Sequence, residues 1–151
     1  MRAGNYCLAA ASLLVLVSHH QATTRPASLS CADLTEASLA HRSFERGNLS
    51  SADLRRADLR ECNLRRADLS QACLQGADLR GADLQGVNLR GANLIAADLR
   101  EARLDGVDFA GAAFSRSTRW PAGFVPAEHG IRGAAGSPIQ HFSFPLPPKA
   151  P

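Results

Sequence analysis

The stretch ADLRGADLQGVNLRGANL, residues 77–94, repeats itself every five residues. Leu79, Leu84, Leu89 and Leu94 mark the period. An α-helix repeats every 3.6 residues and a strand every two, so neither element accounts for a period of five. The stretch therefore predicts an architecture in which five residues form one structural unit.

The five-residue period covers more than half of the chain. Its units are centred on Leu or Phe from Leu29 to Phe114, at every fifth position and without a break in register, which makes eighteen units. The residue two before each centre is nearly always small, the one just before it is usually Asp or Asn, and the two after it are polar, charged or Gly. An array of this kind is a repeat architecture, because no single unit can bury its large side chain alone.

The order of residue types within a unit predicts its shape. The small residue and the centre lie two apart, so a locally extended stretch points both to the same side, while the Asp or Asn between them points into water. The two polar or Gly residues suit a tight turn. Identical units that turn the same way must coil, and coils stack through backbone hydrogen bonds at about 4.8 Å. These arguments leave the number of sides open.

The A(D/N)LXX series resembles the pentapeptide-repeat family over residues 27–116, and AFSRSTRWPAGF, residues 113–124, is similar to the segment that closes the last coil in many members. The resemblance implies an all-β solenoid, a right-handed quadrilateral β-helix of about four to five coils. Residues twenty apart would then stack in columns. We expect a leader at residues 1–22 (a leader helix), the β-helix at 27–116, a C-terminal cap at 117–129 and a disordered tail at 130–151.

One inward position breaks the pattern. Arg42 occupies a slot that small residues fill elsewhere, and a charge buried there would be costly. Since the slot lies in the first coil, we expect either a distorted turn or a side chain that escapes through the open end.

The first 22 residues, MRAGNYCLAAASLLVLVSHHQA, have the features of a signal peptide. Arg2 gives a positive start, and the almost wholly apolar run from Cys7 to Val17 is too short to span a bilayer. Cleavage could follow Ala22 or Ser18, and a short capping helix on the repeat is the alternative interpretation. Cleavage would make the protein periplasmic or secreted, and an uncleaved leader would leave it cytoplasmic.

The net charge of +3 is concentrated in the two ends of the chain. Between residues 31 and 116, twelve Arg stand against thirteen carboxylates, a net charge of −1. This balance gives no argument for a nucleic-acid groove. Four Cys without a CxxC spacing and five scattered His give no argument for a metal site either.

The outward positions predict charged columns. Steps of twenty residues align the Asp at 58, 78 and 98 on one side, together with the Arg at 60, 80 and 100, and further Arg crowd the second coil. This is either a self-compensating solvated face or a binding strip for an acidic or mixed-charge partner. The residues of this candidate interaction strip are Arg55, Arg56, Arg60, Arg65, Arg66, Arg80, Arg100, Asp58, Asp78 and Asp98.

The end of the repeat and the cysteines can also be placed. Trp120 and Phe124 are expected to cover the last coil as an end cap. Cys62 fills an inward slot, while Cys31 and Cys73 lie at a corner and on a side about two coils apart, beyond disulfide reach. In the tail, Phe142, Phe144 and Leu146 form a short apolar cluster that would suit a docking motif.

The leading hypothesis is a non-enzymatic, exported scaffold for an unknown protein partner, with no cofactor. A convex rod offers no cleft for paired carboxylates, and no GxSxG or P-loop is present, so catalysis is not expected. The alternative is a cytoplasmic DNA mimic that inhibits or protects a topoisomerase, as is proposed for some members of the resembled family. An end-to-end dimer is compatible with either hypothesis.

Overall fold

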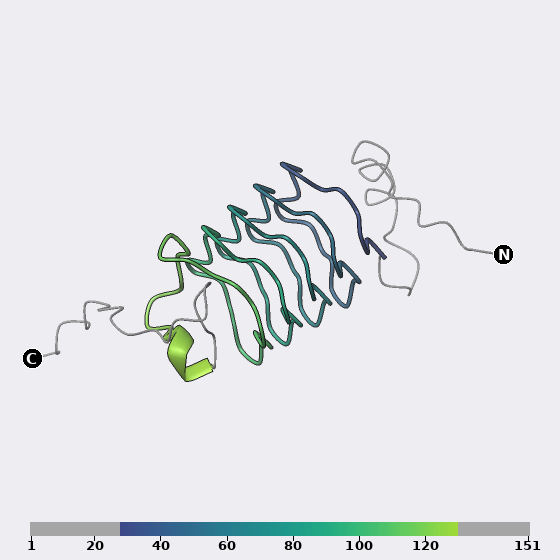
Figure 1. Ribbon diagram of the computed structural model, residues 1–151. Helices are drawn as coiled ribbons and strands as arrows, with labels where there is room; N and C mark the ends of the chain where they lie inside the picture. The colour runs from purple at the N-terminus through teal and green to yellow at the C-terminus, as the bar shows by residue number, and fades with distance from the viewer. Residues whose placement is uncertain (1–27, 130–151) are drawn as a thin grey trace, which may run out of the picture.

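The computed structural model describes residues 28–129 of the chain, so the expected leader and tail lie outside the described residues. The described chain winds into a stack of coils that lie one behind another (Figure 1). Isolated parallel bridges join successive coils, beginning with Ser28–Asn48 and recurring every five residues up to Asn93–Ala113. Each of these bridges joins residues twenty apart, so one coil contains four five-residue units, as the family resemblance implies.

The corners between sides hold one residue in the left-handed conformation. The φ angle is +58° at Glu36, +61° at His41 and +68° at Gly76. The next N–H group bonds back across the corner to the centre of the unit, as from Ala77 to the Leu74 carbonyl at 3.0 Å. This conformation costs roughly 1–2 kcal/mol for a residue with a Cβ atom, which explains why glycine suits these corners.

Three kinds of backbone hydrogen bond join each side to the next coil. The N–H group of Leu54 donates to the Cys73 carbonyl at 2.8 Å, and Arg56 donates to Gln75 at 3.0 Å. In return, Cys73 donates to the Ala52 carbonyl at 2.9 Å. Because the set recurs side after side, the ladder pairs most of the backbone that the stack encloses.

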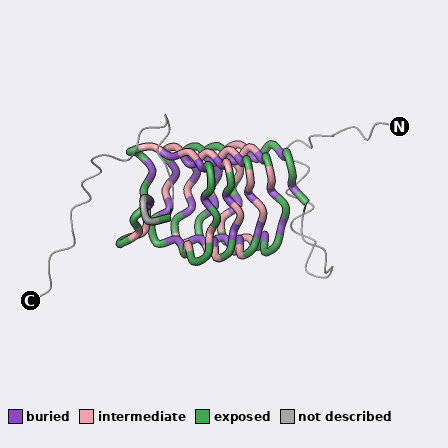
Figure 2. Tube along the Cα trace, turned by 60° about the horizontal axis from the view of Figure 1, so that its bottom comes forward, coloured by how far each residue is buried: buried purple, intermediate pink, exposed green. Residues whose placement is uncertain are grey.

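The interior is made of stacked columns of large and small side chains. Leu54, Leu74 and Leu94 follow one another in one column and are all 0% exposed, and Phe114 ends that column at 3%. Along each turn, buried residues alternate with partly or fully exposed ones (Figure 2). Burying a Leu side chain contributes about 1.5–3 kcal/mol, so the stack supplies the stability that no unit has alone.

The turn at Arg42 is regular. Its N–H group donates to the Leu39 carbonyl at 3.2 Å, and its own carbonyl accepts from Asn63 at 2.9 Å, as at the neighbouring corners of Ala37 and Ala57. Of the two outcomes expected for Arg42, the distorted turn does not occur. Arg42 is half-buried rather than buried, so the residue keeps contact with solvent and avoids the cost of a fully buried charge.

The register slips by one residue at the C-terminal end. Asp98 bridges to Arg119, twenty-one positions further on. A turn holds the extra residue, because Thr118 donates its N–H to the Ser115 carbonyl and accepts from the Ser115 N–H through Oγ1, both at 3.0 Å. The buried Thr118 hydroxyl also donates to the Leu94 carbonyl at 2.8 Å. The five-residue pattern ends at this turn.

The described residues contain one helical element, the 3-10 helix η1 (Pro126–His129), and no strand longer than an isolated bridge. It lies at the C-terminal end of the stack (Figure 1). Within residues 28–129 no helix has the length and apolar character needed to cross a membrane.

Candidate interaction surface

One side of the coil carries an ordered row of opposite charges in three successive coils. The residues just before the centres are Asp, those just after are Arg, and all six are at least partly exposed. We call this row the Asp–Arg strip, and its members are Asp58, Arg60, Asp78, Arg80, Asp98 and Arg100.

Within a unit, one Asp holds one Arg by several bonds. Oδ1 of Asp78 accepts the backbone N–H of Arg80 at 3.2 Å and its Nε–H at 2.8 Å. Oδ2 accepts from Nη2 at 2.6 Å. The other two pairs of the strip repeat this geometry, each with an Nη2–Oδ2 distance of 2.7 Å. Such bidentate, charge-assisted bonds fix the plane of each guanidinium.

The strip continues across coils and ends on a residue that the five-residue pattern misses. Nε of Arg60 lies 3.9 Å from Oδ2 of Asp78 in the next coil, and Nη1 of Arg119 lies 3.6 Å from Oδ2 of Asp98. Arg119 was overlooked because it follows the one-residue slip, where steps of five or twenty no longer apply. The extra residue between Phe114 and Trp120 was the available signal.

The bonds within the strip stabilise its charges. Hydrogen bonding from Arg80 lowers the pKa of Asp78 below its usual value, although burial opposes the shift. The same cause lowers the pKa of Asp58 and Asp98. The bond to Asp78 in turn raises the pKa of Arg80. All members of the strip are therefore charged at neutral pH.

The four remaining arginines predicted for the surface, Arg55, Arg56, Arg65 and Arg66, do not share one side of the coil. Three have carboxylate partners in the described chain: Arg55 with Asp53, Arg56 with Glu36 at 3.2 Å, and Arg65 with Asp83 at 3.4 Å. The fourth, Arg66, is exposed at a corner, with its Cγ beside Gly86. The structure thus brings together the Asp–Arg strip and distributes the other four arginines over two sides and two corners.

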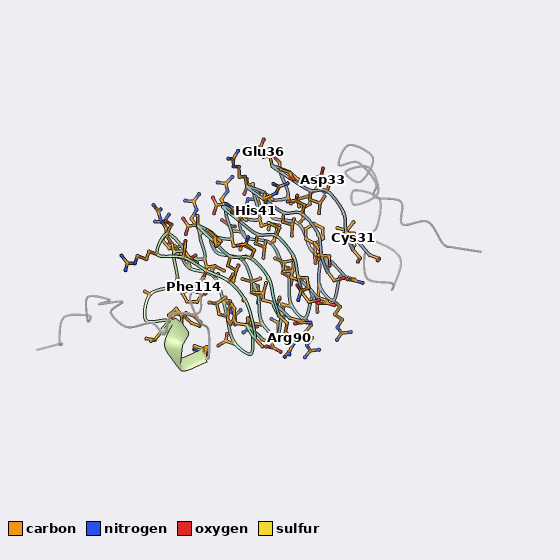
Figure 3. All side chains as sticks on the ribbon, in the orientation of Figure 1. Cys31, Asp33, Glu36, His41, Arg90 and Phe114 are labelled. Carbon is orange, nitrogen blue, oxygen red and sulfur yellow. The ribbon has the colours of Figure 1, made fainter. Side chains whose placement is uncertain are left out.

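Paired charges also occur elsewhere on the coil. Glu36 and His41 stand at successive corners of the coil and lie in the upper part of the view, while Arg90 lies at the bottom (Figure 3). His41 Nδ1 is 3.2 Å from Oε2 of Glu61, and Arg90 Nη1 is 3.0 Å from Oδ2 of Asp108. What distinguishes the Asp–Arg strip is repetition of one geometry in three consecutive coils.

Aromatic rings gather on the last coil. The Trp120 ring meets Phe109 and Phe114 edge-on at centroid distances of 5.8 and 5.7 Å, and stacks on Phe124 at 5.0 Å. Phe124 also stacks on His129 of η1, at 4.5 Å and 8°. We call Trp120 and Phe124 the aromatic cap, because they contact the last inward rings of the stack.

The three described cysteines occupy different environments. Cys62 is buried, its thiol lies 2.9 Å from the Leu39 carbonyl, and burial raises the pKa of that thiol to about 11. Cys73 is half-buried on a side, and Cys31 is exposed at a corner. Among the described residues, no three His, Cys, Asp or Glu side chains are grouped closely enough to hold a metal ion.

A stack of four-sided coils built from five-residue units defines a solenoid repeat protein. The family model for pentapeptide repeats matches the chain in eight copies, over residues 27–65, 48–86 and 82–118. The chain belongs to the pentapeptide-repeat family. No protein of curated function matches it in sequence.

Solved pentapeptide-repeat proteins have the same kind of fold. HetL, from the cyanobacterium Nostoc and involved in regulation of heterocyst differentiation, is 30% identical over 60% of this chain and 46% of its own, with a TM-score of 0.53. A protein of the Arabidopsis thaliana thylakoid lumen is 33% identical over 62% of this chain and 68% of its own, with a TM-score of 0.51. A further Nostoc member is 34% identical over 83% of this chain and 95% of its own, with a TM-score of 0.40. The chain thus spans about half the length of HetL.

Proposed function

We propose that the protein is a non-enzymatic, exported scaffold that binds a protein partner through the Asp–Arg strip. The observation that carries the proposal is the repetition of one fixed Asp–Arg geometry in three coils. Side chains already held in place lose less conformational entropy when a partner binds than free arginines would. A rigid row of charges is thus suited to recognition.

The strip retains donors for a partner. Each arginine commits Nε and Nη2 to its own Asp, and in the described part of the chain no hydrogen bond involves Nη1 of Arg60, Arg80 or Arg100. A guanidinium carries five N–H donors, so its outer edge still offers two or more. Carboxylates or carbonyl oxygens are the groups that match it, which favours an acidic or mixed-charge protein surface.

The charge balance argues against the alternative function. A DNA mimic needs a strongly negative surface, whereas residues 31–116 carry a net charge of only −1. All three carboxylates of the strip are also paired with an arginine in the same unit. The near-neutral surface equally gives no support for nucleic-acid binding.

Export is proposed from the sequence of residues 1–22, which has a positive start and a short apolar core. That one relative is a protein of the thylakoid lumen is compatible with a family member acting outside the cytoplasm. We further propose the remaining organisation as a β-helix at 27–116, a right-handed coil as in the family, a cap at 117–129 and a tail at 130–151.

Site-specific photo-crosslinking in the native host tests the binding surface. A crosslinker in place of Arg80 captures proteins that bind at the strip. One in place of Ser70, two units earlier, captures proteins that bind at a different side of the stack. We expect one recurrent protein adduct from position 80 that disappears when Asp58, Asp78 and Asp98 are changed to Asn. Equal adducts from both positions would show that the strip is not the recognition surface.

A reporter fusion tests export separately. Residues 1–30 are joined to an enzyme that is active only after leaving the cytoplasm, with Leu14→Arg in the apolar core as the control. We expect activity from the native leader and none from the variant. Retention of the native fusion in the cytoplasm would refute export and would favour the alternative of a cytoplasmic DNA mimic.

A further inference from the structure

The backbone ladder stops part of the way around the last coil. One coil earlier, Leu84 donates its N–H to the Arg103 carbonyl at 3.0 Å. Its counterpart Leu104 has no acceptor within residues 28–129, and the Ala102 carbonyl has no donor there. This side of the coil is therefore an open sheet edge, of the kind that recruits another strand.

Side chains on this same side are also incompletely covered. Leu84 is 0% exposed, whereas Leu104 and Val107 are only half-buried. The Trp120 ring meets Phe109 and Phe114 edge-on. An edge with unpaired backbone groups and half-buried apolar side chains is an incomplete part of the core.

The neighbouring side shows how such an edge is closed. Arg119 donates its N–H to the Ala97 carbonyl at 2.9 Å and accepts from the Leu99 N–H at 2.7 Å. Trp120 follows as the inward aromatic and Pro121 comes next. A proline is tolerated there because the residue after each centre bonds to a side chain of its own unit and not to the ladder.

The tail contains the same order of residue types. Ser143, Phe144 and Pro145 repeat the outward residue, aromatic and proline of residues 119–121. The linker between His129, at the capped end of the stack (Figure 1), and Ser143 has 13 residues and spans about 20 Å on average when flexible. A tethered segment of this length reaches millimolar effective concentration at the edge.

We propose that Ser143–Pro145 docks on the open edge at 102–106 as a closing strand. In this arrangement Ser143 donates its N–H to the Ala102 carbonyl, Leu104 donates its N–H to the Ser143 carbonyl, and the Phe144 ring covers Leu104. The contact is independent of the proposed partner binding at the strip. It also occupies the Leu104 N–H and the Ala102 carbonyl, so that strands from other molecules cannot pair with them.

Residue-resolved hydrogen exchange of the full chain tests the contact. We expect the Leu104 amide to be protected, and Phe144→Ser to speed its exchange by about tenfold or more while Leu84 is unaffected. Ile139→Ser, which removes an apolar side chain outside the docking segment, is the matched control and should leave Leu104 protected. Rapid exchange of Leu104 in the unmodified chain, or no effect of Phe144→Ser, would overturn the proposal.

Dilution identifies the source of the strand. Protection by the chain's own tail is independent of protein concentration, because the contact is intramolecular. Protection that requires Phe144 but disappears on dilution would mean that a second copy supplies the strand, and the assignment to the chain's own tail would be wrong.

Discussion

Two positions in each five-residue unit decide whether that unit can join the stack. The inward Leu is enclosed by neighbours above and below, as for Leu74 at 0% exposure. The corner residue must accept a positive φ, as Gly76 does at +68°. The small residue two before the centre is also buried, as for Ala72 at 1% exposure. The two remaining positions of the unit face solvent at least in part, and they tolerate the variety that the sequence shows.

Leu74→Ala leaves a cavity in the middle of a closed column. We expect the free energy of unfolding to fall by about 2–5 kcal/mol, because the coils are held at a fixed spacing and cannot collapse around the void. Chemical denaturation followed by circular dichroism measures it. Leu104→Ala, at the half-buried end of another column, should cost clearly less, and equal losses at the two sites would contradict this account.

The corner position leads to two opposite predictions. Gly76 and Ala96 stand at the same corner in adjacent coils, with φ angles of +68° and +59°. Gly76→Ala should lower the free energy of unfolding by about 1 kcal/mol, because the new Cβ atom disfavours the left-handed conformation. Ala96→Gly should raise it by a similar or smaller amount. Thermal denaturation checks both, and changes of the same sign would refute the argument.

At the scale of the element, the Asp–Arg strip joins backbone and surface, because each Asp binds both a turn N–H and a guanidinium. The strip therefore contributes to stability as well as to recognition. Its ion pairs are partly exposed, with side-chain exposures of 18–31% for the Asp and 43–48% for the Arg. Such pairs are individually weak, so their effect is expected in their sum and not in any single one.

The pH dependence of stability reports on the strip. The pKa values of Asp58, Asp78 and Asp98 are lowered in the folded state, so these carboxylates stabilise the fold above their unfolded pKa of about 4. That stabilisation is lost as the pH falls through the lower folded values. We expect the free energy of unfolding to decrease from about pH 5 downward, as followed by denaturation at several pH values.

Replacement of all three Asp by Asn should lower stability at pH 7 and flatten its decline in acid. Asp105→Asn, outside the strip, is the control and should leave the slope nearly unchanged. A triple variant with the slope of the unmodified protein would show that the acid sensitivity arises elsewhere.

The elements also show what sequence reasoning can reach. The inward columns were predictable because one period in the sequence is one period in space, so Leu34 and Leu54 had to stack once the coil closed at twenty residues. The positions of Arg119 and Thr118 could not be predicted in this way. A single extra residue shifts the register there, and only three-dimensional contacts reveal the shifted register. The bidentate geometry at Asp78 was also beyond reach, since alignment of two columns does not specify which atoms meet.

On the scale of the whole molecule, each coil contacts only its neighbours, so the rod should be tolerant of changes in length. Deletion of residues 61–80 removes one full coil and leaves Asp58 and Asp98 aligned on one side. Deletion of residues 66–70 removes one side, which preserves the inward pattern but moves Asp78 and Asp98 one side away from Asp58. Because the first deletion removes position 80, the crosslinker replaces Arg100 in both variants. We expect both to fold with the circular dichroism of the parent, and only the second to lose the crosslinked partner.

The two variants distinguish the requirements for folding from the requirements for partner recognition. If neither variant folds, the coils depend on longer-range contacts than a stack of neighbours provides. If both retain the partner, continuity of the strip is not what the partner recognises.

The twenty-residue coil has a consequence for how this molecule can change over time. Each side of the stack is built from every fourth unit of the sequence. The repeat therefore encodes four separate surfaces around one shared interior. A substitution such as one at Arg80 alters a single surface and leaves the other three as they were. Substitutions that adapt one surface to a new partner can therefore accumulate while the other three surfaces and the interior remain unchanged.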